Sequence, residues 1–101
     1  MFDLARVVGF DWHDGNARKS LDKYGVSQKE AEEVFVNVPL VVAEDVRHSQ
    51  GEERYQALGK SSLTGRPLHV TFTLREEGTR IRVISARGMN RKERARYEQE
   101  T

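Results

Sequence analysis

The stretch from residue 80 to residue 96 concentrates side chains that can bind phosphate. It holds seven basic residues and one acid, a net charge of +6 in a chain of 101 residues whose formal net charge is only +1. Arg80, Arg82 and Arg87 lie on a predicted strand and its exit, where alternate residues stand about 6 to 7 Å apart, near the spacing of successive phosphates. Arginine suits this task because its planar, permanently charged fork binds phosphate through two hydrogen bonds. We predict a phosphate-binding row here; the alternative is a solvated strand face whose arginines pair with nearby glutamates.

The basic stretch continues into a predicted helix that carries further cations. Arg91 and Arg94 could line one side of it together with Arg87, and Tyr97 follows Arg94 by three residues, so it could stack on a ligand or donate a proton. Lys23, in an earlier helix, offers another cation. The simpler interpretation is a charged surface helix whose tyrosine packs against the sheet.

A polar loop offers the leading candidate for an acid or base. His48 lies in DVRHSQGEERY, where a nearby aspartate could orient its ring and raise its pKa toward neutrality. Glu53 and Arg54 enter the next strand and could complete a site or form a salt bridge. His48 could instead only cap the turn. His13 and His69 rank lower, because the first lies in a turn and the second alternates along a strand with no acidic neighbour in sequence.

Several other chemistries find no support in the sequence. The chain has no cysteine, so it has neither disulfides nor thiolate metal ligands. HExxH, GxGxxG and GxxxxGK motifs are absent. No apolar run approaches the ~20 residues of a membrane span, and the first residues lack the order of a signal peptide. We expect a cytoplasmic protein with no metal, no cofactor and no membrane partner.

The elements that must position these side chains follow from periodicity. A length of 101 residues suits one domain, spanning 1–101. Apolar patterns predict strands at 7–12, 39–45, 53–60, 68–74 and 79–86, and helices at 15–24, 28–37 and 91–100. The order β-α-α-β-β-β-β-α predicts the α+β class: a small antiparallel sheet of four to five strands, packed by two N-terminal helices and a C-terminal helix. One sheet face should be packed and the other cationic.

Local signals mark the ends of these helices. Asp14 could cap the first helix, and Gly25 is placed to end it in the left-handed conformation. Ser27 followed by Glu30 forms a capping-box pattern before the second helix. Asn90 could cap the third, with a glutamate at its third position.

Three blocks of the chain, in this order, resemble one known family. They are WHDGNARKSLDKYGVSQKEAEEVF, EDVRHSQGEERYQALGK and RIRVISARGMNRKERARYE. Together they resemble the BrnT toxins of bacterial type II toxin–antitoxin pairs over about residues 9–98, and ISAR followed by a basic ERxxYE helix is the most specific part. The resemblance implies a fold similar to RelE and ParE toxins and a metal-independent, RelE-like endoribonuclease. It also implies a cognate BrnA-like antitoxin with a ribbon-helix-helix domain. The toxin would contact operator DNA only through this antitoxin.

With RNA as the implied substrate, cleavage needs a base for the 2′-hydroxyl, cations for the phosphate and an acid for the leaving oxygen. The candidate catalytic residues are His48, Glu53, Arg54, Arg80, Arg82 and Tyr97, and the candidate RNA phosphate ligands are Lys23, Arg87, Arg91 and Arg94. Residues 29–54 carry a net charge of −4. Charge is therefore segregated, which favours one cationic site on an acidic body, a site that an antitoxin's acidic side chains could cover.

The first helix departs from the family pattern. Asn16, Ser20 and Tyr24 stand where family members often carry Lys, Asn and His, while Lys23 and Gly25 are kept. This departure favours an alternative, a non-catalytic module that only holds a DNA-binding antitoxin. A third alternative, a plain nucleic-acid-binding protein, would require stacking aromatics among the cations, and only Tyr97 qualifies.

Overall fold

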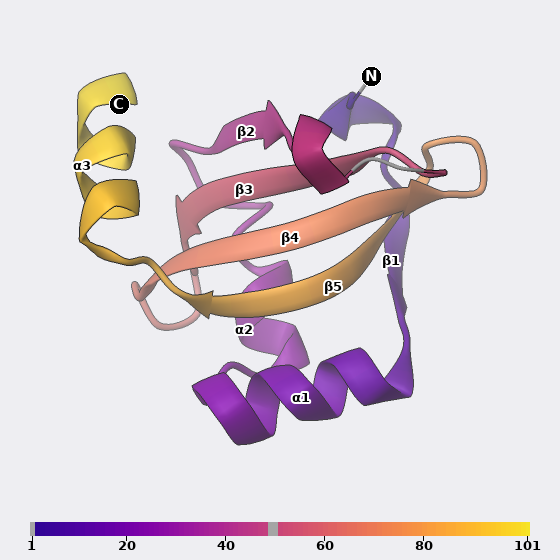
Figure 1. Ribbon diagram of the computed structural model, residues 1–101, viewed down its shortest axis with the longest axis horizontal. Coiled ribbons are helices and arrows are strands. Elements are labelled where there is room, and N and C mark those ends of the chain that lie inside the picture. The colour runs from indigo at the N-terminus through magenta and orange to yellow at the C-terminus, as the bar shows by residue number, and fades with distance from the viewer. Residues whose placement is uncertain (1, 49–50) are drawn as a thin grey trace.

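The computed structural model describes residues 2–48 and 51–101, and its elements follow the predicted order (Figure 1). The strands are β1 (Gly9–Trp12), β2 (Val41–Glu44), β3 (Arg54–Lys60), β4 (Pro67–Arg75) and β5 (Arg80–Gly88). The helices are α1 (Asp14–Tyr24), α2 (Gln28–Glu32) and α3 (Arg91–Glu100), with short 3₁₀ turns at Leu4–Arg6 and Val46–His48. The α+β class is confirmed. No helix in the described ranges is both long and apolar enough to cross a membrane.

The five strands form one mixed sheet in the order β1-β5-β4-β3-β2. Strands β2 to β5 are antiparallel, as predicted, but β1 runs parallel to β5. This pairing differs from the prediction because the first strand joins the last one at an edge, a long-range contact that local patterns do not encode. It buries Phe10 and Trp12 against the core, on the same side as Ile81 and Val83.

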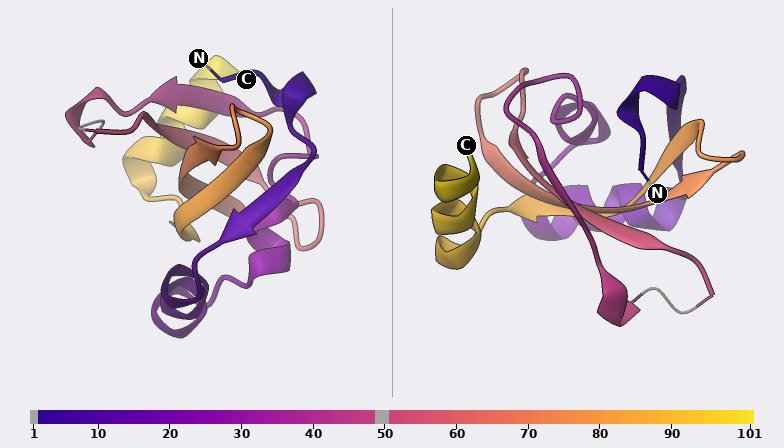
Figure 2. Two further views of the ribbon diagram at one scale, coloured as in Figure 1. Left: turned by 90° about the vertical axis from the view of Figure 1, so that its right-hand side faces the viewer. Right: turned by 90° about the horizontal axis from the view of Figure 1, so that it is seen from above.

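Helix α2 covers one face of the sheet, α1 lies along the edge of β5, and α3 stands at one end of the sheet (Figures 1 and 2). The core lies between α2 and the sheet, where Phe35 packs edge-on against Phe72 with ring centroids 5.1 Å apart. Phe72 also stacks on Tyr55 at 5.4 Å. Alternate residues of β4 and β5 enter this core and their neighbours face away, so one face of the sheet is packed, as predicted, and the other is polar.

The ends of the helices confirm two of the predicted capping residues and correct one. His13, not Asp14, caps α1, because its Nδ1 accepts from the amide of Gly15 at 3.2 Å. Gly25 ends α1 with φ 67°, as predicted. Asn90 and Glu93 form the predicted capping box of α3.

The second helix is shorter than predicted. After Glu32 the chain continues through turns with i→i+3 hydrogen bonds, Phe35 to Glu32 at 3.1 Å and Asn37 to Val34 at 3.4 Å. These turns bury Val34 and Phe35 as expected, but they leave Val38 85% exposed, because the helical periodicity has ended before it. Ser27 caps the helix, but the carboxylate of Glu30 accepts from the Thr64 hydroxyl at 2.6 Å, so the predicted capping box forms only by half.

A β-bulge in β5 changes which side chains share a face. Thr71 pairs with Ser85 and Phe72 pairs with Val83, so Ile84 is an extra residue without a cross-strand partner. Strict alternation would place Arg87 on the face opposite to Arg82. The extra residue shifts the alternation by one, and Arg87 lies on the polar face with Arg82.

Candidate active site

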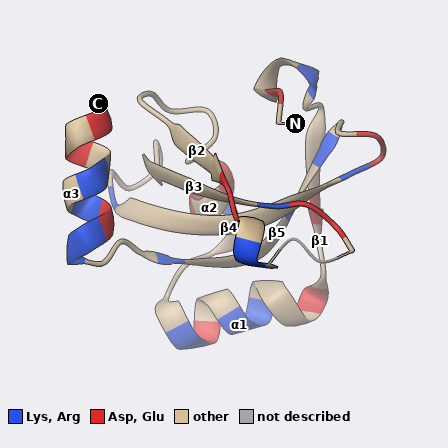
Figure 3. Cartoon of the chain, turned by 45° about the horizontal axis from the view of Figure 1, so that its top comes forward, with Lys and Arg blue, Asp and Glu red and all other residues tan. Residues whose placement is uncertain are grey.

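The polar face of the sheet carries basic side chains on both strands that flank β4. Arg54 on β3 and Arg82 on β5 both lie opposite Thr73 of β4, one on each side, so their backbones are about 10 Å apart. Figure 3 shows further basic residues gathered on α3 at the end of the sheet. The face is thus cationic across β3, β5 and the start of α3.

A pocket of about 350 Å³ opens on this face beside α3. We call it the site pocket; it is lined by Asp45, Arg54, Gln56, His69, Thr71, Ile84, Ser85, Arg87 and Glu93. Strands β3, β4 and β5 supply its floor, and the first turn of α3 closes one end. Residues far apart in sequence therefore converge on a single cavity.

Arg87 is held in place by several hydrogen bonds at the site pocket. Its Nη1 and Nη2 donate to the two carboxylate oxygens of Glu93 at 2.8 and 2.9 Å, and Nη1 also donates to the carbonyl of Gly88 at 3.1 Å. These bonds use three of the five N–H donors of an arginine. The other two, on Nε and Nη2, meet no acceptor among the described residues and form a second fork for an oxyanion.

His69 lies against the same ion pair. Its Nε2 is 3.6 Å from a carboxylate oxygen of Glu93, and its side chain is only 8% exposed. Burial lowers the pKa of His69 and the charge of Arg87 lowers it further, while Glu93 acts in the opposite direction. The imidazole is therefore neutral near pH 7 and able to accept a proton.

The opposite wall of the site pocket is held by polar contacts. The amide of Asp45 donates to the carbonyl of Arg54 at 2.7 Å, and Nε2 of Gln56 donates to the Asp45 carboxylate at 3.1 Å. Arg54 and Arg87 both line the pocket. Of the ten candidates from the sequence, the structure brings these two arginines together around one cavity.

Arg80 and Arg82 lie on the same face but outside the site pocket. Nη2 of Arg80 donates to the carbonyl of Phe10 at 2.6 Å, and Arg82 donates from Nε and Nη2 to Asp11 at 3.2 and 2.8 Å. Both side chains therefore fasten β5 to β1. Both remain partly exposed.

Glu53 also lies outside the site pocket. It borders a different hollow with Tyr55, whose hydroxyl donates to its carboxylate. Burial and then Glu53 raise the pKa of Tyr55 to about 12, while the bond from Tyr55 lowers the pKa of Glu53. This pair joins β3 to the core.

The remaining candidates are dispersed. Tyr97 is 5% exposed and its hydroxyl donates to the carbonyl of Pro39 at 2.7 Å, so it anchors α3. Arg91 and Arg94 lie exposed on α3 and line a separate hollow. Lys23 is exposed on α1, with Nζ 5.4 Å from the ring of Tyr24. The side chain of His48 lies outside the described residues, although its backbone follows Asp45 by three positions.

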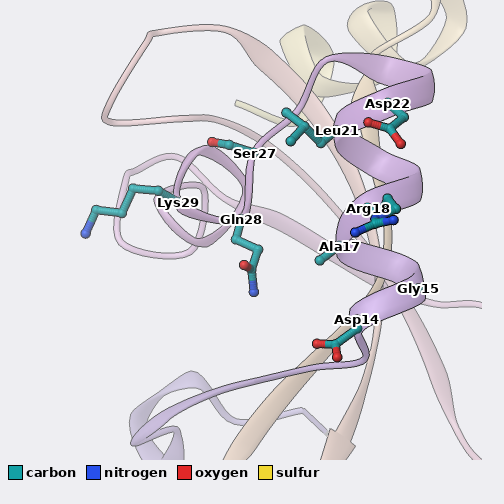
Figure 4. Close-up of a pocket in the computed structure, with 9 residues that line it drawn as sticks. All are labelled: Asp14, Gly15, Ala17, Arg18, Leu21, Asp22, Ser27, Gln28 and Lys29. Carbon is teal, nitrogen blue, oxygen red and sulfur yellow. The ribbon is translucent and has the colours of Figure 1, made fainter.

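A larger hollow lies elsewhere, between α1 and α2 (Figure 4). Its charged lining residues are Asp14, Arg18, Asp22 and Lys29, two acids and two bases. None of the ten candidate residues lines it. A mixed-charge hollow without a buried titratable group offers less chemistry than the site pocket, despite its larger volume.

Sequence reasoning ranked His69 low and treated Glu93 only as a helix cap. Both line the site pocket, because β4 pairs His69 with Arg87 and Arg87 reaches Glu93. The signal that could have found them is the hairpin register, combined with the bulge. The described residues contain no group of three or more His, Cys, Asp or Glu side chains that could hold a metal ion.

Comparison with known proteins assigns a family. The model of the family described as "Ribonuclease toxin, BrnT, of type II toxin-antitoxin system" matches residues 12–93, which include every residue of the site pocket. No match was found among curated proteins. The matched segment covers most of the chain and extends from the last residue of β1 to the first turn of α3. The chain therefore belongs to the BrnT family of ribonuclease toxins of type II toxin–antitoxin systems.

Proposed function

We propose that this ribonuclease toxin cleaves RNA in the site pocket, with Arg87 and Arg54 holding the phosphate that is cut. The observation that carries this proposal is the second, unused fork of Arg87, fixed by Glu93 beside a neutral histidine. A guanidinium held by a carboxylate keeps its orientation and needs no reorganisation when a phosphate arrives.

The chemistry follows from the groups around the site pocket. His69 takes the proton of the 2′-hydroxyl as this oxygen attacks the adjacent phosphorus and the bond to the 5′-oxygen breaks. Glu93, 3.6 Å from the imidazole, stabilises the imidazolium that forms. Arg54 and Arg87 stabilise the negative charge that gathers on the phosphate. His48, close to Asp45 in the chain, is our candidate for the acid that protonates the leaving oxygen. No metal ion is required in this scheme.

The RNA path extends from the site pocket in two directions. Toward β1, Arg82 and Arg80 present partly exposed guanidinium groups on the same face. Toward α3, Arg91 and Arg94 are exposed. We place flanking phosphates at these two groups of cations, where contacts add affinity without base specificity. Lys23, Glu53 and Tyr97 play no direct part in cleavage in this scheme.

The substituted first helix does not weaken this assignment. Asn16, Ser20 and Tyr24 do not line the site pocket. Ser20 is 1% exposed, and its hydroxyl accepts from the amide of Ala86 at 3.1 Å, so it completes the free edge of β5. The Tyr24 carbonyl accepts from Arg66 at 3.2 Å. The role of Ser20 is structural, and we propose that catalysis proceeds without the family-typical residues at these positions.

A type II toxin implies a cognate antitoxin. We propose that this antitoxin is a BrnA-like protein with a ribbon-helix-helix domain, and that the toxin reaches operator DNA only through it. The support is the resemblance of three sequence blocks to BrnT toxins. Co-purification of the toxin with the small protein encoded beside it, followed by operator binding with and without the toxin, tests this proposal.

Cleavage of RNA by purified variants tests the site. Arg87→Ala should lower kcat at least about 100-fold, as loss of a preorganised charge donor does elsewhere. Arg75→Ala is the matched control: Arg75 is also a β-sheet arginine in an ion pair, with Glu52 at 3.1 Å, but lies outside the site pocket. It should cleave at the wild-type rate. A folded Arg87→Ala variant that cleaves normally would refute the assignment.

The pH profile tests the base. His69 is neutral only above its pKa, which burial holds below the ordinary value of 6.5. The rate of cleavage should therefore fall as the pH drops through that lowered pKa. The His69→Gln variant should cleave much more slowly, and its rate should no longer show this decrease at acidic pH. An identical acidic limb in His69→Gln would assign the base to another group.

A further inference from the structure

A second groove lies against another side of α3, next to the end of β3. It has a volume of about 510 Å³ and is lined by Val38, Pro39, Lys60, Gly65, Pro67, Met89, Arg94, Tyr97, Glu98 and Thr101. We call it the α3 groove. Its three α3 residues and the C-cap residue Thr101 follow the spacing i, i+3, i+4, i+7 and so form one side of the helix. Glu93, which faces the site pocket, is not among them.

The floor of the α3 groove is apolar and fixed. Tyr97 is buried, and its hydroxyl is bound to the carbonyl of Pro39, so the helix and the loop before β2 are locked together. Pro67 and Met89 complete the floor. At the rim, Val38 is 85% exposed. Val38 therefore presents an accessible apolar side chain to any molecule bound in the groove.

The walls of the α3 groove are cationic. Lys60 and Arg94 form no ion pair with another described residue, and Glu98 is the single acid that lines the groove among the described residues. A shallower hollow continues from it and adds Arg91, sharing Met89, Arg94 and Glu98. Arg91 is the first residue of α3, where a positive charge opposes the helix dipole. The positive charges at this end of α3 do not stabilise the helix, and an anionic partner that binds there would neutralise them.

We propose that the cognate antitoxin docks in the α3 groove, through a segment with an apolar side chain between acidic ones. The apolar side chain packs on Met89 beside Val38, and the carboxylates pair with Lys60 and Arg94. Charge complementarity and the exposed Val38 at the rim of the groove carry this proposal. It rests on the toxin–antitoxin function and locates the surface that the partner uses.

Other occupants fit less well. Arg94 can contact a flanking RNA phosphate, as proposed above, but single-stranded RNA that filled the groove itself would use exposed aromatic rings for stacking, and the one aromatic residue of the groove, Tyr97, is 5% exposed. A second copy of the chain would bring its own Lys60 and Arg94 against the same cations around a two-fold axis. An acidic protein segment avoids both difficulties.

Binding of the purified antitoxin, the small protein encoded beside this chain, tests the proposal by titration calorimetry. Val38→Asp and Lys60→Glu should each raise the Kd at least about tenfold. Two matched controls should leave the Kd unchanged: Lys60→Arg keeps the charge, and Val8→Asp places the same carboxylate on a valine that is 79% exposed beside β1, away from the groove. RNA cleavage by free Val38→Asp and Lys60→Glu should remain at the wild-type rate.

Three outcomes would overturn the proposal. The first is an unchanged Kd in both groove variants. The second is a loss of RNA cleavage by the free groove variants, which would make the groove an RNA contact. The third is a toxin dimer that the groove variants dissociate, seen by light scattering. Calorimetry does not depend on cleavage, so a failure of Arg87→Ala to inactivate the enzyme would reject the site pocket and leave this test intact.

Discussion

Replacing Glu93 by glutamine isolates the contacts that tie α3 to the site pocket. The carboxylate accepts from Nη1 and Nη2 of Arg87 at 2.8 and 2.9 Å and from the amide of Asn90 at 2.9 Å. Glutamine has the same shape, but it presents one N–H group where an oxygen now accepts from Arg87. One charge-assisted hydrogen bond is therefore replaced by two donors that face each other.

The expected loss of stability follows from these contacts. A hydrogen bond to a charged group contributes about 1.5–3 kcal/mol. The Glu93 side chain is 18% exposed, so water replaces little of the lost bond. We expect Glu93→Gln to lower the free energy of unfolding by about 2 kcal/mol, which in a domain of this size corresponds to a fall in Tm of roughly 8–16 °C.

Thermal unfolding followed by circular dichroism measures this change. Glu100→Gln is the control, because it makes the same substitution on the same helix in an exposed pair with Arg96, where Glu100 is 47% exposed. Exposed pairs contribute about 0–1 kcal/mol. Its Tm should therefore change by only a few degrees.

The stability difference between wild type and Glu93→Gln should depend on pH. Burial raises the pKa of Glu93, but the hydrogen bonds from Arg87 and Asn90 outweigh it and hold the pKa below the ordinary value of 4.5. A carboxyl with a lowered pKa stabilises the fold above 4.5 and loses that contribution as pH falls through the folded value. The difference should narrow below about pH 4.5. A Tm within 2 °C of wild type at pH 7, or a difference that does not narrow, refutes the reasoning.

Two further substitutions separate structural from catalytic roles. Tyr97→Phe removes the hydroxyl that donates to Pro39 at 2.7 Å and should cost about 1 kcal/mol in chemical denaturation, with RNA cleavage unchanged; a large loss of cleavage in a stable variant would return Tyr97 to the active site. Ser20→Ala leaves the amide of Ala86 without its acceptor and should cost about 1–3 kcal/mol in the same assay. A Ser20→Ala variant as stable as the wild type would show that another group serves that amide.

Much of the fold could be predicted because its signals are local. Asn90 and Glu93 specify the start of α3, and Gly25 specifies the end of α1, since each acts within one turn of helix. The hairpin of β4 and β5 follows from alternation around a glycine at φ 86°. The parallel pairing of β1 with β5 could not be predicted, because it joins residues about 70 positions apart.

The candidate site was only partly predictable. The abundance of arginine on β5 and α3 is visible in the sequence. It was enough to identify Arg87 as a candidate, and Arg54 was a candidate because it enters a predicted strand after the polar loop. Which arginines surround a cavity depends on partners that alternation does not reveal: Asp11 engages Arg82, whereas Arg87 keeps two donors. His69 had no acidic neighbour in sequence, and obtained one only because the register of β4 places it opposite Arg87.

Because Ile84 has no cross-strand partner, the number of residues in β5 determines on which face of the sheet Arg87 lies. Deletion of Ile84 would have one of two results. If the side chains after residue 84 kept their faces, the pairing of β5 with β4 would be disrupted. If the pairing became regular, Arg87 would point into the apolar core. Relatives that carry the same arginine should therefore conserve the count of residues between Val83 and Arg87, even where the residue types differ.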